Sequence, residues 1–552
     1  MTRARWPVSA FWLLGALGLI GATALALAQG HGDAAPFTLV TATPAAINRP
    51  LRLLDFTPFE EAMDTLTDTR LAELDDLVFE VSITDLQAAF ANGDLTAEEL
   101  TRYYLHRIQA YDADGLHAVL ELNPQALAIA RALDAERAAG TVRGPLHGIP
   151  VLLKDNIGTG DDLHTTAGAA ALIGAHADRD AFIVARLREA GAIILGKTNL
   201  SEWANFISSD LPNGFAAVGG QTRHPYGDFD PGGSSTGSAV AVSANLVTVA
   251  IGTETQGSII SPASASSVVG LYPSRTIVSR DRVIPLTGHM DSAGPIGRSV
   301  ADVAVVLTVI IGVDTNDPAT ADAAAFDGVA FTQFLDADAL QGVRVGVVMQ
   351  PGVDEATFVR TFLTQPVADA FAAAGAELVF VPQPPVEADV MTVFFHDFRI
   401  EAAAYLSATG APVSTLAEVV ALNAANAETH IPYGQDLLAR TAADTADAAE
   451  ILALAEQNRV TMAGVLRGLL ADYEVDVLVS LNNELAGHYA PAGFPAITVP
   501  GGYRRDGEPF GVTIVGDHLS DGDLIGYAYA FEQASGVRIP PPVGVPVGVP
   551  GE

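Results

Sequence analysis

The sequence predicts an α/β protein built around a largely parallel or mixed β-sheet. Short apolar runs, each long enough for a buried strand, alternate with longer segments that have apolar residues at helical spacing. Of the 552 residues, 49% are hydrophobic and 17% are charged, as expected of a globular chain with a sizeable core. This length fits a large α/β enzyme domain without a clear internal boundary.

The first helical pattern lies between residues 82 and 112. Its apolar residues recur at helical spacing, and Asn92-Gly93 interrupts them, so the segment predicts two helices. Thr96 and Glu99 have the spacing of a capping box at the start of the second helix. A further amphipathic helix is predicted over Leu122–Gly140.

The same alternation continues through the rest of the chain. Predicted strands cover Ile149–Leu153, Ala192–Leu195, Val343–Met349, Ala376–Val381, Asp476–Ser480, Ala496–Val499 and Phe510–Val515. Predicted helices cover Ala181–Gly191, Glu355–Ala374 and Asp523–Ser535. Strands that alternate with helices in this way are typical of an α/β architecture.

The first 28 residues have the features of a signal peptide. Arg3 and Arg5 precede an apolar run from Phe11 to Ala28, and Ala26-Leu27-Ala28 has the small-x-small pattern of a cleavage site. The run is also about long enough to span a membrane. We therefore expect an exported protein, periplasmic or secreted, with a retained N-terminal membrane anchor as the alternative.

The remaining chain divides into three parts. Residues 29–78 form an N-terminal extension with an acidic helical stretch near Phe59–Leu77. Residues 79–540 form the main domain. Residues 541–552 are rich in proline, glycine and valine, which predicts a flexible tail.

The composition excludes several kinds of function. The chain has no cysteine, so disulfides, thiolate catalysis and cysteine-bound metals are ruled out. Its net charge of −36 opposes binding to nucleic acid and to anionic membranes. The 12 histidines show no metal-ligand spacing, so we expect no metal site, and we expect His147 to be structural.

The two lysines stand out against the other basic residues. Of the 29 lysines and arginines, only Lys154 and Lys197 are lysines. Arginine keeps its proton in a protein, whereas a buried lysine can lose it. Both lysines follow short apolar runs, and we expect Lys154 to transfer protons. For Lys197 we expect a structural role with Glu202 as its partner.

The stretch from Gly232 to Pro262 combines small residues with many hydroxyl groups. It reads GGSSTGSAVAVSANLVTVAIGTETQGSIISP, with few bulky side chains and almost no charge. Such a segment can pack its backbone tightly and direct N–H groups and hydroxyls at one point. We interpret it as the centre of a serine hydrolase that acts on amides.

These features, together with Lys154, resemble the amidase signature family. The resemblance covers about residues 80–540, which makes this part an amidase domain over residues 79–540. It is strongest in GPLHGIPVLLKDNI, GAIILGKTNLSEWANF, GGSSTGSAVAVSAN, GTETQGSI and SAGPIGRSVADV. The GTET–GSI, SEWANF and IVSRD–VIP segments are most similar to bacterial peptide amidases, which hydrolyse C-terminal peptide amides.

The resemblance implies a fold and a catalytic triad. The fold is a central mixed sheet covered by helices on both faces. The triad consists of Ser258 as nucleophile, Ser234 as a bridging serine after a cis peptide bond, and Lys154 as base. Neutral Lys154 takes a proton from Ser234, which takes one from Ser258, and Ser258 attacks the amide carbonyl.

The same resemblance implies an oxyanion hole and a set of partners. The oxyanion hole consists of the backbone N–H groups of Thr255, Gln256 and Gly257. The partner is a small-molecule or peptide amide substrate, with no metal, no organic cofactor, no nucleic acid and no obligate protein partner.

Two residues depart from the family pattern. Gln256 stands where peptide amidases have aspartate, and Ile260 stands where much of the family has arginine. An isoleucine suits a neutral or apolar substrate better than a carboxylate. Peptide, fatty-acid and aryl amides therefore all stay open as substrates.

Three other interpretations compete with this one. An exported, inactive amidase-fold binding protein would explain Gln256 but not the retained triad. Gly233–Gly237 matches the nucleophile elbow of α/β-hydrolases, which needs a preceding strand that HPYGDFDPGG does not provide. A tRNA-dependent amidotransferase subunit is opposed by the export signal, the net charge and Ile260.

Overall fold

The computed structural model describes residue 51 and residues 53–543. The predicted signal peptide, the predicted extension up to residue 50 and the end of the predicted tail lie outside these residues. All described residues belong to one unit of the chain. None of the helices within them is long and apolar enough to span a membrane.

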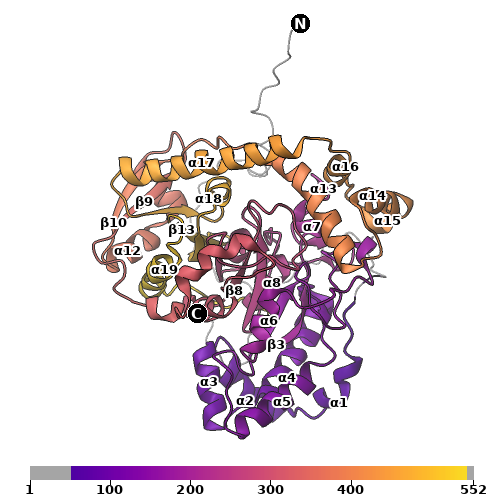
Figure 1. Ribbon diagram of the computed structural model, residues 1–552. Coiled ribbons are helices and arrows are strands. Elements are labelled where there is room, and N and C mark those ends of the chain that lie inside the picture. The colour runs from indigo at the N-terminus through magenta and orange to yellow at the C-terminus, as the bar shows by residue number, and fades with distance from the viewer. Residues whose placement is uncertain (1–50, 52, 544–552) are drawn as a thin grey trace, which may run out of the picture. The chain divides into compact units, whose positions relative to one another are not determined.

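A mixed β-sheet runs through the described residues (Figure 1). Its strand order is β1-β3-β2-β6-β8-β7-β12-β13-β11-β9-β10. Parallel pairs join β3, β2 and β6 near one end and β11, β9 and β10 at the other, with antiparallel pairs between them. The strands are β1 (Val119–Leu122), β2 (Pro150–Lys154), β3 (Ile193–Thr198), β6 (Val249–Glu254), β7 (Val269–Tyr272), β8 (Ser292–Gly297), β9 (Arg344–Met349), β10 (Glu377–Pro382), β11 (Val477–Leu481), β12 (Ala496–Tyr503) and β13 (Pro509–Val515). A separate hairpin pairs β4 (Phe215–Ala216) with β5 (Gly220–Gln221).

Many helices alternate with strands as the sequence predicts, but α1–α4 and α13–α17 are two runs of helices without a strand between them. In the first half of the chain they are α1 (Glu60–Met63), α2 (Asp68–Val78), α3 (Ile83–Asn92), α4 (Ala97–Arg107), α5 (Ala126–Ala138), α6 (Phe182–Glu189), α7 (Glu202–Asn205), α8 (Thr236–Ser243) and α9 (Ile260–Ala265). In the second half they are α10 (Val300–Ile310), α11 (Glu355–Phe358), α12 (Gln365–Ala373), α13 (Val390–Thr409), α14 (Leu416–Ala425), α15 (Ala427–His430), α16 (Asp436–Ala442), α17 (Ala448–Asp472), α18 (Ala486–Ala492) and α19 (Asp521–Ser535). The predicted capping box of α4 is present, with Thr96 and Glu99 bonded reciprocally.

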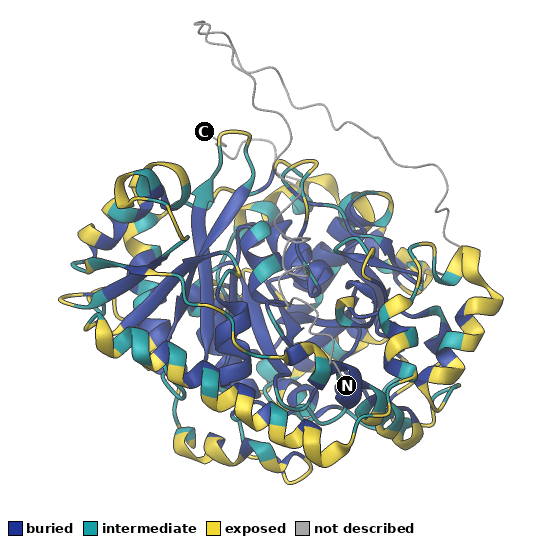
Figure 2. Ribbon diagram, turned by 90° about the horizontal axis from the view of Figure 1, so that it is seen from above, coloured by how far each residue is buried: buried dark blue, intermediate teal, exposed yellow. Residues whose placement is uncertain are grey.

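Helices cover both faces of the sheet, which confirms the predicted fold class. Residues 294 and 297 of β8 point to opposite faces because side chains alternate along a strand. A Cβ built at Gly294 would meet Ile259, next to α9, whereas one at Gly297 would meet Val303 of α10. Figure 2 shows the buried strands enclosed by helices whose exposed residues face outward.

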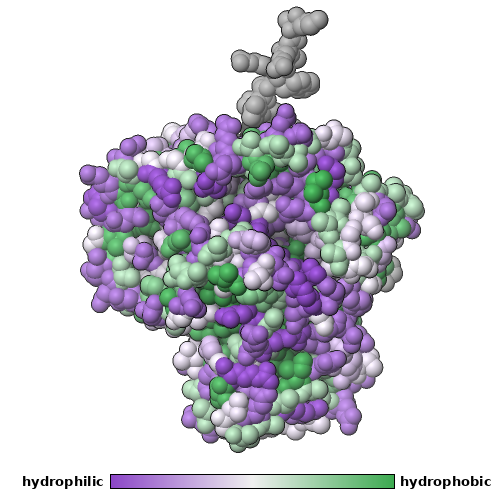
Figure 3. All heavy atoms as spheres, in the orientation of Figure 1, coloured by the Kyte–Doolittle hydropathy of each residue, from purple (hydrophilic) through white to green (hydrophobic). Residues whose placement is uncertain are grey.

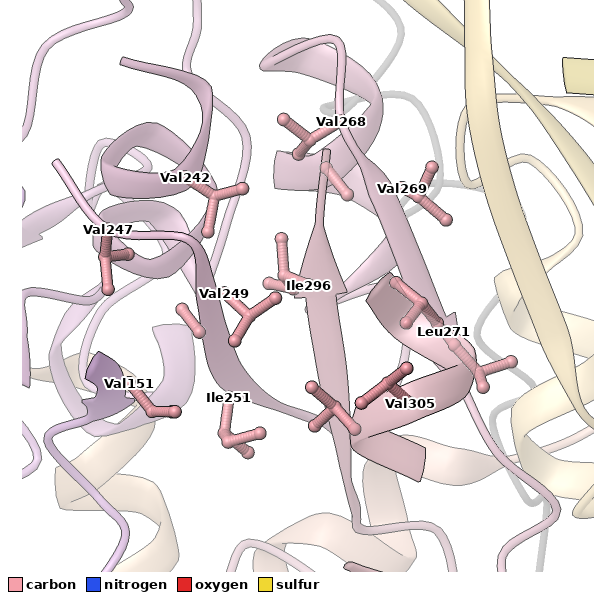
Figure 4. Packing of buried hydrophobic residues seen from close by; sticks show 14 of the residues in the cluster. Val151, Val242, Val247, Val249, Ile251, Val268, Val269, Leu271, Ile296 and Val305 are labelled. Atoms are coloured by element: carbon pink, nitrogen blue, oxygen red, sulfur yellow. The ribbon is translucent and has the colours of Figure 1, made fainter. Parts of the chain in front are cut away.

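The core around the central strands consists of β-branched and leucine side chains. Val249 of β6 and Leu271 of β7 lie on the face of the sheet that α10 covers, together with Val305 of α10, whereas Ile296 of β8 lies on the opposite face (Figure 4). Val249, Ile296 and Leu271 are fully buried. This packing fixes the central strands, so the loops at their ends start from rigid positions.

A helical group, α13–α17, is joined by side-chain hydrogen bonds to loops in other parts of the domain. The Thr287 hydroxyl donates to Asp397 of α13 at 2.6 Å, and the Ser209 hydroxyl donates to Asp436 of α16 at 2.8 Å. The helices α17 and α18 also contact each other extensively. The group is therefore fixed to the rest of the domain at several points.

The surface is mostly hydrophilic. On the face in Figure 3, hydrophilic residues alternate with small hydrophobic areas, and a paler hydrophobic region lies over α14 and α15. Leu422 of α14 is among its exposed residues.

Candidate active site

The predicted site residues come together at one edge of the sheet. β2 ends at Lys154 and β6 ends at Glu254, and the two strands pair in parallel with Leu153 opposite Ile251. The carboxyl ends of paired parallel strands lie at the same edge of a sheet, where α/β proteins place their ligand sites. The loops after both strands therefore meet there.

Lys154 is fully buried and makes three hydrogen bonds. Its Nζ lies 2.8 Å from Ser234 Oγ, 3.0 Å from Ser235 Oγ and 3.0 Å from the carbonyl oxygen of Thr253. No carboxylate accepts a hydrogen bond from it among the described residues. The amine is thus held by neutral partners.

Ser234 lies just before α8, and its peptide bond to Gly233 is cis. The Ser201 N–H donates to the Ser234 carbonyl at 3.1 Å. A Cβ built at Gly233 would lie 2.5 Å from Ser201 Oγ and 2.7 Å from Asn213 Oδ1. A side chain at position 233 would crowd these polar groups, so the glycine lets the chain pass close to them.

Ser258 lies in the turn between β6 and α9. Its carbonyl accepts a hydrogen bond from the Ser235 N–H at 2.9 Å, which joins the two serine-bearing segments. The residue is 8% exposed, and its hydroxyl forms no hydrogen bond with the other described residues. This hydroxyl is the one in the cluster that is free to receive a ligand.

Glu254 holds the turn that contains Ser258. Its carboxylate accepts hydrogen bonds from the N–H groups of Gly257, Ile259 and Ile260 at 2.7, 2.7 and 3.0 Å. The hydroxyl of Tyr489 donates to the same carboxylate at 2.6 Å. Burial raises the pKa of Glu254, while these donors favour its charged form.

The predicted oxyanion segment differs at one residue. The Gly257 N–H points at Glu254 Oε1, so it is engaged within the protein. The N–H groups of Thr255, Gln256 and Ser258 have no acceptor among the described residues. The Thr255 hydroxyl donates to Asp291 at 2.6 Å, so Asp291 orders this loop.

The electrostatics of the site favour a neutral lysine. Burial lowers the pKa of Lys154 to about 7, and the carboxylates of Glu254 and Asp291 only partly oppose this shift. At a pKa of about 7, about half of the molecules have a neutral amine at pH 7, against about one in a few thousand for a lysine in water.

Lys197 occupies a separate, structural position, but its predicted partner is wrong. Its Nζ donates to the carbonyl of Ile157 at 2.6 Å and to Thr165 Oγ1 at 3.1 Å, and Asp155 is the principal nearby charge. Glu202 instead accepts from the Ala217 N–H at 2.8 Å. Burial raises the pKa of Glu202 to about 8, because it lacks a cation.

The other singled-out residues have structural partners. His147 is buried and bonded to backbone groups of Leu133 and Arg143. Ile260 is fully buried in an apolar cluster that also contains Tyr272. The described residues contain no group of three or more side chains suited to hold a metal ion.

Sequence reasoning missed three residues of the site. Ser235 stands beside Ser234 in the quoted motif, but its contact with Lys154 has no separate signal. Glu254 is the acidic residue of GTETQGS, and its spacing to Gly257 hints at a turn-holding role. Tyr489 lies 235 residues from Glu254 in the chain, so only the fold brings the two together.

Comparisons with known proteins show the family of this chain. The family model described as Amidase matches residues 99–481. A probable amidase of Arabidopsis thaliana is 40% identical over 476 residues, covering 84% of this chain and 91% of the relative.

Two solved structures are also similar to this one. An amidase family protein from Bacillus anthracis has a TM-score of 0.84 at 36% identity and covers 88% of this chain and 97% of its own. The native peptide amidase from Stenotrophomonas maltophilia has a TM-score of 0.79 at 41% identity and covers 84% and 99%. The chain therefore belongs to the amidase signature family and is an amidase, a hydrolase of linear amide C–N bonds.

Proposed function

We propose that this amidase hydrolyses the C-terminal carboxamide of peptides to a carboxylate and ammonia, with Ser258 as nucleophile, Ser234 as proton bridge and Lys154 as base. One observation carries the catalytic part of the proposal: Lys154 is fully buried, without a carboxylate partner, and lies 2.8 Å from Ser234 Oγ. A buried amine of this kind can act as a base near neutral pH.

The proposed relay is supported by the hydrogen bond between Lys154 and Ser234 and by the backbone hydrogen bond that joins the Ser235 and Ser258 segments. The Ser258 hydroxyl attacks the amide carbonyl while its proton passes to Ser234 Oγ, and the Ser234 proton passes to Lys154 Nζ. Return of the protons along the same path converts the leaving NH₂ group to ammonia. Water then repeats the attack on the acyl-enzyme and releases the carboxylate.

The free backbone N–H groups of the Ser258 turn suit the developing negative charge. We assign this role to the N–H groups of Thr255, Gln256 and Ser258, since the Gly257 N–H is bonded to Glu254 at 2.7 Å. Preorganised donors of this type contribute several kcal/mol to transition-state stabilisation.

The proposed substrate class rests on the similarity of this chain to a known peptide amidase. The peptide amidase of Stenotrophomonas maltophilia is 41% identical and covers 84% of this chain. The GTET, SEWANF and IVSRD segments, which lie around the candidate site and its neighbouring loops, support the same substrate class. A terminal carboxamide is small and neutral, and so needs no cation at position 260.

A labelling experiment tests the catalytic part. A fluorophosphonate should modify Ser258 in the folded protein, as located by mass spectrometry, and Ser258→Ala should abolish both labelling and hydrolysis. Ser264→Ala provides the matched control, because Ser264 is a buried serine on α9 that bonds to Thr498. A folded protein that takes no label would instead indicate an inactive, amidase-fold binding protein.

Ammonia release from a substrate panel tests the specificity. Peptide amides should give a kcat/KM at least about tenfold above fatty-acid amides and aryl amides of similar size. A higher kcat/KM for either of the other two classes would replace the peptide assignment and leave the mechanism intact.

A further inference from the structure

A second serine, Ser235, contacts the candidate base. Ser235 is fully buried and precedes the first residue of α8, and its Oγ lies 3.0 Å from Lys154 Nζ. The same oxygen lies 3.1 Å from the Thr253 nitrogen and 2.9 Å from the Thr253 carbonyl oxygen. The hydroxyl therefore has three polar neighbours, and a count of donors and acceptors determines what each bond must be.

The count begins at Thr253. Its N–H can only donate, so it donates to Ser235 Oγ, and its carbonyl can only accept, so the Ser235 hydroxyl proton points at that carbonyl. Any other assignment would leave two oxygen atoms 2.9 Å apart with no proton between them. Toward Lys154, Ser235 Oγ has only a lone pair left, so it accepts from the amine.

The same count then fixes the orientation of the amine. A neutral lysine amine has two N–H groups and one lone pair. Ser235 Oγ and the Thr253 carbonyl both accept from Lys154, so they use both N–H groups. The lone pair must therefore point at the remaining neighbour, Ser234 Oγ, at 2.8 Å.

We propose that Ser235 is a positioning residue that directs the lone pair of neutral Lys154 at the Ser234 hydroxyl. The proposal rests on the proposed function, in which the Ser234 proton moves to Lys154 Nζ while Ser234 Oγ receives the Ser258 proton. Both transfers conserve protons within the three side chains. Ser235 itself gains and loses none, because its hydroxyl proton stays on Oγ and is donated to the Thr253 carbonyl.

Without this hydroxyl, the amine orients wrongly. In a Ser235→Ala variant, the two N–H groups of Lys154 would bond to the Thr253 carbonyl and to Ser234 Oγ, and the lone pair would face the alanine methyl group. The base would be present and neutral, yet it could not accept the Ser234 proton without rotating first. The kcat should therefore fall by about 10- to 100-fold, with KM within about twofold of the unmodified protein.

The pH profile separates this role from loose packing. Loss of an acceptor destabilises the ammonium form, so the acid limb of kcat/KM should move to lower pH in Ser235→Ala. Loosened packing that admits water would move the limb to higher pH, because a hydrated lysine has a higher pKa. Ser235→Thr keeps the hydroxyl, so its acid limb should stay in place whatever its overall rate.

A matched control lies one turn further along the same helix. Ser238 is also fully buried, and its hydroxyl bonds to Thr198 Oγ1 at 2.7 Å and to the Ile251 carbonyl at 3.2 Å, without touching Lys154. Ser238→Ala should lower the melting temperature as Ser235→Ala does, but leave kcat and the acid limb unchanged.

Steady-state kinetics with a peptide amide at pH 5–9, beside circular dichroism melts, test the proposal. A Ser235→Ala plateau within twofold of the unmodified protein would overturn it, as would an acid limb displaced to higher pH or a displaced limb in Ser235→Thr. If the proposed function itself were wrong, the Ser258→Ala variant would retain hydrolysis. That outcome is distinct from each of the results above.

Discussion

Burial, rather than a charged neighbour, sets the properties of Lys154. The side chain is buried at the carboxyl end of β2, where desolvation lowers its pKa to about 7. Glu254 and Asp291 favour the charged amine, but both are engaged by other donors. Burial alone therefore gives this lysine a pKa suited to a base near neutral pH.

The activity should depend on pH through this lysine. A base must be neutral to accept a proton, so kcat/KM should rise with pH up to about 7 and level off above it, losing about tenfold per pH unit below. The profile should be recorded with a neutral peptide amide, with circular dichroism at each pH to show that the protein stays folded. An acid limb centred near pH 10 would contradict the buried, neutral base.

Removal of the amine should abolish hydrolysis with little change in shape. Lys154→Met keeps an unbranched side chain of similar length in the fully buried position. We expect kcat to fall by at least about 10³-fold. Ser258 should still be accessible to a fluorophosphonate but react far more slowly. An unchanged labelling rate in this variant would separate Lys154 from activation of the nucleophile.

At the scale of elements, the turn after β6 is held from a distant part of the chain. Glu254 binds three backbone N–H groups of the turn, and Tyr489 of α18 supplies a fourth donor. A hydrogen bond to a buried carboxylate is stronger than one between neutral groups. The position of Ser258 thus depends on the docking of α18.

Two neighbouring tyrosines allow this link to be measured. Tyr489→Phe should lower the free energy of unfolding by about 1.5–3 kcal/mol, because the buried Glu254 loses a donor. Tyr272 is equally buried, and its ring centroid lies 5.6 Å from that of Tyr489. Its hydroxyl, however, donates to the Met290 carbonyl at 2.7 Å. Tyr272→Phe should cost about 1 kcal/mol in urea unfolding. Equal losses would show that the charge of Glu254 adds nothing.

Some elements deviate from the sequence-based prediction for identifiable reasons. The single helix predicted over Glu355–Ala374 is divided into α11 and α12, because Thr364 has φ of 71° and Pro366 lies at the start of α12. The residues of α7 that follow Glu202 form a left-handed turn, with φ of 52°, 54° and 71° at Trp203, Ala204 and Asn205. Such a turn costs about 1–2 kcal/mol per residue, so tertiary contacts must hold it.

At the scale of the whole molecule, one ion pair joins distant parts of the chain. Arg538, just after α19, forms two hydrogen bonds with Glu80, just before α3, at 2.9 and 2.8 Å. The same guanidinium bonds to the carbonyls of Ser243 and Ser267 beside the central strands. The pair therefore joins two segments that lie 458 residues apart in the sequence.

Removal of this arginine should destabilise the fold. Arg538→Ala leaves a largely buried Glu80 carboxylate with fewer partners, and we expect a loss of about 3 kcal/mol in urea unfolding. Arg459 is the control, since its pair with Glu456 on α17 is exposed and three residues apart. Arg459→Ala should change stability by less than about 0.5 kcal/mol. A similar effect of both substitutions would mean that Arg538 acts only as a surface residue.

The fold class could be predicted from the sequence, and the family resemblance of the sequence also named the candidate triad residues. Buried strands such as Ala496–Val499 can be predicted because their residues are almost all apolar. The two lysines can be singled out because every other lysine or arginine position holds arginine. The motif around Gly233 and Ser234 also places the cis peptide bond, which the structure contains. The strands and the motif are local features, so they can be recognised from neighbouring residues. The scarcity of lysine needs only a count over the chain.

Only the tertiary structure decided how the site is held. The contact of Ser235 with Lys154, the bond between Tyr489 and Glu254, and the bonding of Lys197 to Ile157 and Thr165 rather than to Glu202 all depend on strand register and helix docking. A hydrogen bond is lost when its donor and acceptor move apart by more than a few tenths of an ångström. A sequence pattern, in contrast, predicts where a side chain lies only to within a residue or more. Partner choice among buried polar groups is therefore settled by packing.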